Sequence, residues 1–117
     1  MKYHILVMMK ATPKWLAMSK TYREKFFTDV VYPLFISFTP QLQIQLFSAE
    51  AFHANVSDYI TIETTELQHH YQFMQQLRSS RIFSDGYFEL ADVIVSAENG
   101  FRKFNEEARK EKKLIMN

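Results

Sequence analysis

The stretch Gln41-Leu42-Gln43-Ile44-Gln45-Leu46 decides the fold, because a polar and an apolar residue alternate at every step. Alternation with a period of two predicts a β-strand that turns its leucines and isoleucine to one face and its glutamines to the other. A second alternating run spans Asp58 to Thr64. The two runs predict an antiparallel hairpin joined by a long connection.

The patterns on either side of this hairpin predict four further elements. Tyr3 to Lys10 is apolar on both faces, which indicates a central strand. Lys20 to Phe38 carries a wide helical stripe, and Pro33 should kink this helix or divide it. Glu66 to about Arg78 predicts a second helix and Phe88 to Ala97 a last strand.

This order, strand-helix-strand-strand-helix-strand, is typical of the α+β class and of the ferredoxin-like split β-α-β sandwich. We expect residues 1–117 to form one ferredoxin-like domain. Asn99-Gly100 ends the last strand, and Phe101 to Lys113 predicts a terminal helix. Residues from about 110 to 117 are expected to be a charged C-terminal tail.

Composition narrows the classes of function. Fourteen Lys and Arg residues against thirteen Asp and Glu leave a net charge of +1, which argues against nucleic acid and anionic membranes as partners. The chain has no cysteine, which excludes disulfides and thiolate chemistry and fits the cytoplasm. No segment is long and apolar enough to cross a bilayer.

No motif for catalysis or nucleotide binding stands out. The sequence contains no G-x-G-x-x-G, P-loop, H-E-x-x-H or G-x-S-x-G pattern and only two glycines. We therefore expect no cofactor, while the question whether this protein is an enzyme stays open.

The sheet face opposite the helices should be mixed in character. Because eleven phenylalanines need burial and a two-layer domain offers limited interior, a second subunit is the simplest cover for this face. The sequence thus predicts a homodimer of the dimeric α+β barrel type, with a polar-lined cavity. The alternative is a monomer whose second face is covered by the C-terminal segment. The candidate interface residues are Gln43, Gln45, Phe47, Tyr59 and Thr61, with Glu63 beside them.

Four residues are candidates for binding a ligand. Glu50 and His53 share the connection between the hairpin strands, with Asp58 close behind, and a histidine beside a carboxylate suits acid–base work or metal binding. In the alternative reading, Glu50 and Asp58 bind backbone amides and His53 lies on the surface. Trp15, the sole tryptophan, should either stack on a ligand at the cavity mouth or anchor a short helix.

Other polar residues have structural explanations. Glu66, His69 and His70 have a spacing that could bind metal, but the helix dipole explains Glu66 and a core position explains His70, so no metal is predicted. Arg23 should either extend to solvent or pair with a buried carboxylate. The faces of His4 and Asp92 cannot be assigned from single-strand patterns.

Several segments together resemble the darcynin family of small bacterial proteins. They are Thr12-Pro13-Lys14-Trp15-Leu16-Ala17-Met18-Ser19, Ala49-Glu50-Ala51-Phe52-His53-Ala54, Val56-Ser57-Asp58, Phe88-Glu89-Leu90 and Glu98-Asn99-Gly100-Phe101. The resemblance covers almost the whole chain and implies a bacterial, ferredoxin-like protein of about this size. It implies no catalytic residue and no established activity.

Two functions fit these observations. The first is a cytoplasmic homodimer that binds a small hydrophobic or aromatic compound, or performs cofactor-independent acid–base or oxygenation chemistry on it. The alternative is a noncatalytic protein-interaction or regulatory module. The first requires Trp15, Glu50, His53 and Asp58 to converge on one pocket.

Overall fold

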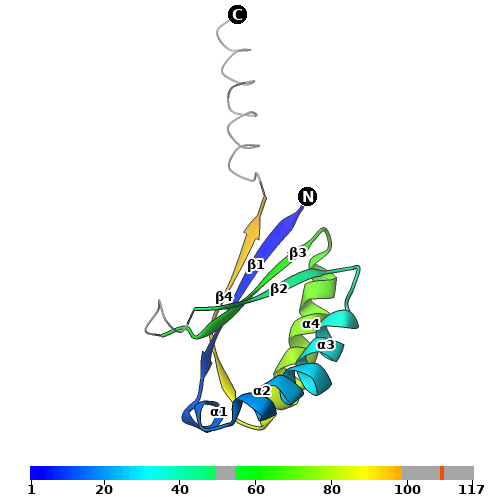
Figure 1. Cartoon of the computed structure of the whole chain (residues 1–117). Helices are drawn as coiled ribbons and strands as arrows, with labels where there is room; N and C mark the ends of the chain where they lie inside the picture. The colour runs from blue at the N-terminus through cyan, green and yellow to red at the C-terminus, as the bar shows by residue number, and fades with distance from the viewer. Residues whose placement is uncertain (50–54, 99–108, 110–117) are drawn as a thin grey trace, which may run out of the picture.

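The computed structural model describes residues 1–49, 55–98 and 109, and in this part of the chain an antiparallel sheet carries helices on one face (Figure 1). The strands are β1 (Tyr3–Ala11), β2 (Gln43–Ser48), β3 (Asp58–Thr64) and β4 (Phe88–Ala97), in the order β2-β3-β1-β4. This order is that of the ferredoxin-like fold predicted from the sequence. The first strand is central, as its two apolar faces indicated.

The helical layer begins with two capped helices, α1 (Pro13–Leu16) and α2 (Lys20–Phe26). The Thr12 hydroxyl accepts the N–H of Trp15, and the Ser19 hydroxyl accepts the N–H of Tyr22. Both are side-chain caps that satisfy backbone donors at a helix start.

Pro33 has the predicted effect of dividing the long helix. The segment continues from α2 through a π-helical turn, η1 (Phe27–Val31), into α3 (Tyr32–Ile36). Proline offers no N–H and its ring crowds the carbonyl four residues earlier, so the helix widens just before it.

The same helical layer contains α4 (Leu67–Ser79) and the short α5 (Arg81–Ser84). After α5 the chain turns at Gly86, whose φ of +75° suits glycine, and enters β4. In the hairpin, β2 begins two residues later than its alternating pattern, because the Leu42 N–H donates to the Phe38 carbonyl in a preceding turn.

The core lies between the sheet and the helices. Ile5, Val7, Ile60 and Ile62 are at most 2 % exposed, and Phe73 of α4 is fully buried against them. Alternate residues on these strands therefore face away from the helices, onto what we call the open face.

The open face has the composition predicted from the sequence. Gln43 lies opposite Glu63, Gln45 opposite Thr61, and Phe47 opposite Tyr59. The register of β1 adds His4, Leu6 and Met8 to this face, and that of β4 adds Asp92 opposite Met8. The faces of His4 and Asp92, which single-strand patterns leave undecided, are thus assigned by strand pairing.

In the described residues, no helix is long and apolar enough to cross a membrane.

Candidate functional site

An apolar pocket of about 110 Å³ lies between the sheet and the helices, and we call it the inner pocket. Its walls come from β1, β2, β3, the helical segment from α1 to α3, and the α4–α5 region. The lining residues are Met9, Trp15, Phe27, Val31, Phe35, Leu46, Asp58, Ile60, Leu77, Ile82 and Phe88.

Trp15 is fixed in its wall by an aromatic cluster. Its ring centroid lies 5.4 Å from that of Phe26, 5.3 Å from that of Tyr87 and 5.0 Å from that of Phe88. Contacts at these distances hold α1 against the helical layer and the start of β4. Trp15 therefore anchors the short helix, as one of the two sequence-based readings expected, and its ring also lines the inner pocket. That it stacks on a ligand stays a prediction.

Arg23 packs on the same tryptophan rather than on a carboxylate. Its guanidinium lies 5.7 Å from the Trp15 ring centroid, and its Nη2 donates to the Leu16 carbonyl at 2.8 Å. A cation–π contact and one hydrogen bond thus meet part of the guanidinium's need for polar partners. Neither expectation for Arg23, extension to solvent or a carboxylate partner, describes this arrangement.

Asp58, the first residue of β3, lies in the wall of the inner pocket that the sheet forms. The Ser57 hydroxyl donates to its Oδ2 at 2.8 Å, while the N–H of Ala11 donates to that hydroxyl at 2.7 Å. The Ser57 N–H also donates to the Met9 carbonyl at 2.9 Å. These bonds tie the carboxylate to the end of β1. Among the described residues that line the inner pocket, Asp58 is the only one that carries a charge.

The π-helical turn supplies the third wall through Phe27 and Val31. Such turns occur frequently at functional sites, because the widened backbone redirects side chains. These residues belong to the helical stripe that the sequence shows between Lys20 and Phe38, where they read as ordinary core positions. Their place at a pocket depends on the turn before Pro33, which the stripe alone does not reveal.

Two of the four predicted ligand residues line one pocket and two are not placed. Trp15 and Asp58 lie on facing layers of the inner pocket although they are far apart in the sequence. Glu50 and His53 lie outside the described residues. The chain on either side of them is anchored, since the Ala49 N–H donates to the Ser57 carbonyl at 2.7 Å.

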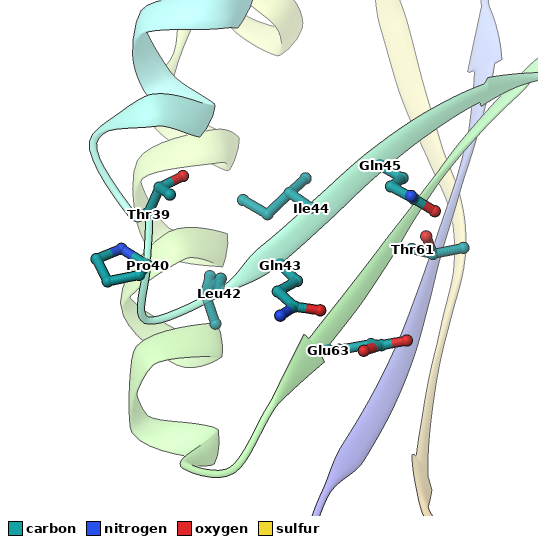
Figure 2. Close-up of a pocket in the computed structure, with 8 residues that line it drawn as sticks. All are labelled: Thr39, Pro40, Leu42, Gln43, Ile44, Gln45, Thr61 and Glu63. Atoms are coloured by element: carbon teal, nitrogen blue, oxygen red, sulfur yellow. The ribbon is translucent and has the colours of Figure 1, made fainter.

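A second hollow, of about 460 Å³, lies at the free edge of β2 (Figure 2). Figure 2 shows the Gln43 side chain extending toward Glu63 and the Gln45 side chain toward Thr61. Three of the candidate interface residues thus border this hollow. Its lining is Thr39, Pro40, Leu42, Gln43, Ile44, Gln45, Thr61 and Glu63.

The open face is polar at one end and aromatic at the other. At the polar end, His4 Nε2 lies 2.9 Å from a Glu98 oxygen, and His4 Nδ1 lies 3.6 Å from a Glu63 oxygen. The hydrogen bond from His4 holds the pKa of Glu98 below its usual value. At the other end, the rings of Phe47 and Tyr59 stack with centroids 5.0 Å apart.

The three residues with a metal-like spacing do not all converge on one point. His69 Nε2 pairs with Glu66 at 3.1 Å. His70 is buried, its Nδ1 has no hydrogen-bond partner in the part of the chain that the structure describes, and burial lowers its pKa. Across the same described residues, no group of three or more His, Cys, Asp or Glu side chains could hold a metal ion.

Solved structures with the same fold include a chlorite dismutase from Candidatus Nitrospira defluvii, with a TM-score of 0.68 and 10% identity over 80% of this chain. A protein from Thermus thermophilus described as heme-binding has a TM-score of 0.72 and 12% identity over 87% of this chain. This chain spans only 38% and 43% of those two chains. At such identities the likeness shows the ferredoxin-like fold.

Sequence relatives carry one family name. A Darcynin homolog from Streptomyces avermitilis is 31% identical over 97 residues, which are 83% of this chain and 79% of the relative. A Darcynin from Chromobacterium violaceum is 36% identical over 66 residues, 56% of this chain and 84% of the relative. The family model described as "Darcynin, domain of unknown function" matches residues 2–111. With nearly the full length matched, this chain belongs to the darcynin family.

Proposed function

We propose that this protein is a cytoplasmic homodimer that binds a small aromatic or apolar molecule in the inner pocket. The observation that carries the proposal is the placement of Trp15 and Asp58 on two walls of one otherwise apolar pocket. A few polar groups in an apolar hollow are the usual composition of a ligand site. The carboxylate favours a ligand that carries a hydrogen-bond donor or a positive charge.

The size of the pocket limits the ligand. At about 110 Å³ it is smaller than the roughly 300–1,000 Å³ typical of sites for drug-sized molecules. A cavity of about 150 Å³ lined by apolar side chains binds benzene. The inner pocket therefore suits a single ring or the apolar end of a longer molecule.

Haem does not fit this pocket. A porphyrin is far larger than one ring, and haem iron is held by histidine, cysteine or tyrosine in many proteins. None of these three residue types occurs among the described residues that line the inner pocket. The proposal therefore does not extend the heme-binding description of the Thermus thermophilus protein to this chain.

The dimer part of the proposal rests on the open face. Stacked Phe47 and Tyr59 offer an aromatic patch, and Leu6 and Ile94 extend it across β1 and β4. Gln43, Gln45 and Thr61 add hydrogen-bonding groups that a second copy of the same face could meet across a two-fold axis.

Ligand binding can be tested by titrating the Trp15 fluorescence with toluene and with benzylamine, which differ in the charged amino group. We expect both to change the fluorescence and benzylamine to bind more tightly. Asp58→Asn should remove the preference for benzylamine while retaining toluene. Val31→Phe, which fills the pocket, should abolish both signals.

Ile36→Phe is the matched control, because Ile36 is exposed and does not line the pocket. Unchanged binding in Val31→Phe, or no response of the parent protein to either probe, would contradict the proposal. Glu50 and His53 remain predicted ligand residues. His53→Ala should fold normally and bind benzylamine more weakly than the parent.

A further inference from the structure

The residues that line the inner pocket divide into a buried floor and an exposed rim. The floor is formed by side chains that are at most 4% exposed, namely Met9, Ile60, Leu77 and Ile82. Phe27 and Leu46 are each 40% exposed, and no other described residue of the lining is exposed to this extent. We therefore place the opening of the pocket between these two side chains and call it the mouth.

The Leu46 side of the mouth is fixed by the sheet. Leu46 lies opposite Ile60 in the ladder between β2 and β3. Because β2 is the outermost strand in the order β2-β3-β1-β4, the mouth lies at the edge of the sheet (Figure 1). Hydrogen bonds between the strands hold the backbone of Leu46, so this side of the mouth moves only if the hairpin opens.

The Phe27 side of the mouth lies on the π-helical turn. The Tyr32 N–H donates to the Phe27 carbonyl, five residues earlier, which is the hydrogen bond of a π-helix. Among the described rings, Phe27 contacts that of Tyr32, with centroids 6.3 Å apart, and Tyr32 is itself 53% exposed. The backbone of Phe27 is therefore held in place while its ring lies near the surface.

Two other aromatic residues of the lining are held more firmly. Trp15 packs on Phe26 and Phe35 packs on Phe73, and both of these partner rings are buried. Side chains in a close-packed core resist displacement, whereas exposed side chains change rotamer in picoseconds to nanoseconds. Phe27 therefore moves more easily than Trp15 or Phe35.

A ligand that enters the inner pocket has to pass the mouth. The space inside is about 110 Å³, which is close to the size of one ring, so a ring that fills it contacts the rim as well as the floor. A saturated six-membered ring is thicker than an aromatic one. It therefore has to displace Phe27 further than a flat ring does.

We propose that Phe27 gates the inner pocket and thereby selects flat aromatic amines as ligands. This inference rests on the ligand binding proposed above. The Phe27 ring swings toward solvent to admit a ligand and then returns to close the mouth opposite Leu46. The amino group of the ligand lies at Asp58, and its ring occupies the apolar part of the pocket.

Stopped-flow measurement of the Trp15 fluorescence tests the gate with benzylamine and cyclohexylmethylamine, which carry the same amino group on rings of different thickness. We expect the parent protein to associate with benzylamine at least about ten times faster than with cyclohexylmethylamine. Phe27→Ala should reduce this ratio to less than about three. The same variant should raise the association and dissociation rates of benzylamine by a similar factor of at least about ten, because a gate changes the barrier in both directions.

Ile36→Ala is the matched control. Ile36 is an exposed apolar residue of α3, in the same helical segment, and it does not line the pocket. This variant should leave all rates unchanged. Phe27→Trp places a larger ring at the mouth and should slow both the association and the dissociation of benzylamine.

The outcomes separate the gate from the ligand site. If the parent binds benzylamine but Phe27→Ala leaves its association rate unchanged, or raises its dissociation rate alone, the gate is overturned while the ligand site stands. Equal association rates of the two amines in the parent would overturn the selection of flat rings. The same acceleration in Ile36→Ala would also overturn the gate. If the parent binds neither amine, the ligand site is contradicted and the gate with it.

Discussion

The hydroxyl groups of Tyr22 and Tyr87 lie 2.6 Å apart and form a hydrogen bond between α2 and the residue that precedes β4. Both rings also pack on Phe26, with centroids 6.3 Å and 5.1 Å away. This contact joins the helical layer to the start of the last strand. The Tyr87 ring also packs on Trp15, with centroids 5.3 Å apart, so this contact supports the wall of the inner pocket.

Tyr22→Phe should lower the melting temperature by about 2–6 °C, because it leaves the buried Tyr87 hydroxyl without its partner. Tyr32→Phe, at a residue that is 53% exposed, is the control and should have almost no effect. Differential scanning calorimetry measures both. Equal melting temperatures in parent and Tyr22→Phe would show that the hydrogen bond adds no stability.

The same hydrogen bond predicts that the protein loses stability at alkaline pH. It is the main reason that the pKa of Tyr87 is raised above the usual value of a tyrosine. A raised pKa means that the stabilisation is complete below the unfolded value and is lost as pH rises through the folded value. Above about pH 10, the melting temperature should therefore fall more steeply with pH in the parent than in Tyr87→Phe.

Phe47→Glu should shift the protein from dimer to monomer in sedimentation experiments at micromolar concentration. The substitution places a charge in the aromatic end of the open face, where a partner sheet would remove it from water. Tyr32→Glu makes the same kind of change at an exposed aromatic residue of the helical layer and should leave the mass unchanged. A monomeric parent at every concentration would contradict the dimer.

His70 should make stability fall as the solution is acidified. Burial lowers its pKa below 6.5, so the unfolded chain takes up a proton before the folded one does. This contribution to stability is present above about pH 6.5 and is lost as pH falls, by at most about 1.4 kcal/mol per pH unit. His70→Leu should flatten this part of the profile, whereas His69→Leu should retain it. Chemical denaturation between pH 7.5 and 5 distinguishes them.

Leu77→Ala should enlarge the inner pocket and destabilise the protein. Leu77 is 0% exposed and lines the pocket from α4, so its truncation should cost about 2–5 kcal/mol in free energy of unfolding. The larger pocket should then accept naphthalene, which we expect the parent to exclude. A variant that loses stability but gains no naphthalene binding would show that the cavity collapses or lies apart from the ligand site.

A chelator should leave the melting temperature unchanged. The Glu66 and His69 side chains pair with each other, and His70 is buried apart from them. A structural metal contributes directly to the free energy of folding. A large loss of melting temperature in the presence of EDTA would therefore show a metal that this prediction excludes.

The sequence by itself determined the order of the four strands and of the two main helical segments, and the character of each sheet face, but not α5 or the π-helical turn. Strand patterns repeat every two residues and helix stripes every three to four. The alternation after Gln41 therefore identifies a strand, and the stripe after Lys20 identifies a helix, without knowledge of the rest of the fold. The predicted ends of β3 and β4 agree with the structure residue for residue. The darcynin resemblance, read from short segments, was confirmed by the family model.

Only the tertiary structure decided which distant residues meet. Trp15 follows β1 and Asp58 begins β3, and no pattern within either segment shows that both line one pocket. Strand pairing likewise assigned His4 to the open face, because a shift of one residue in register would reverse every side chain. Local periodicity fixes which face a residue shares with its neighbours in sequence, whereas packing between layers fixes its partners in space.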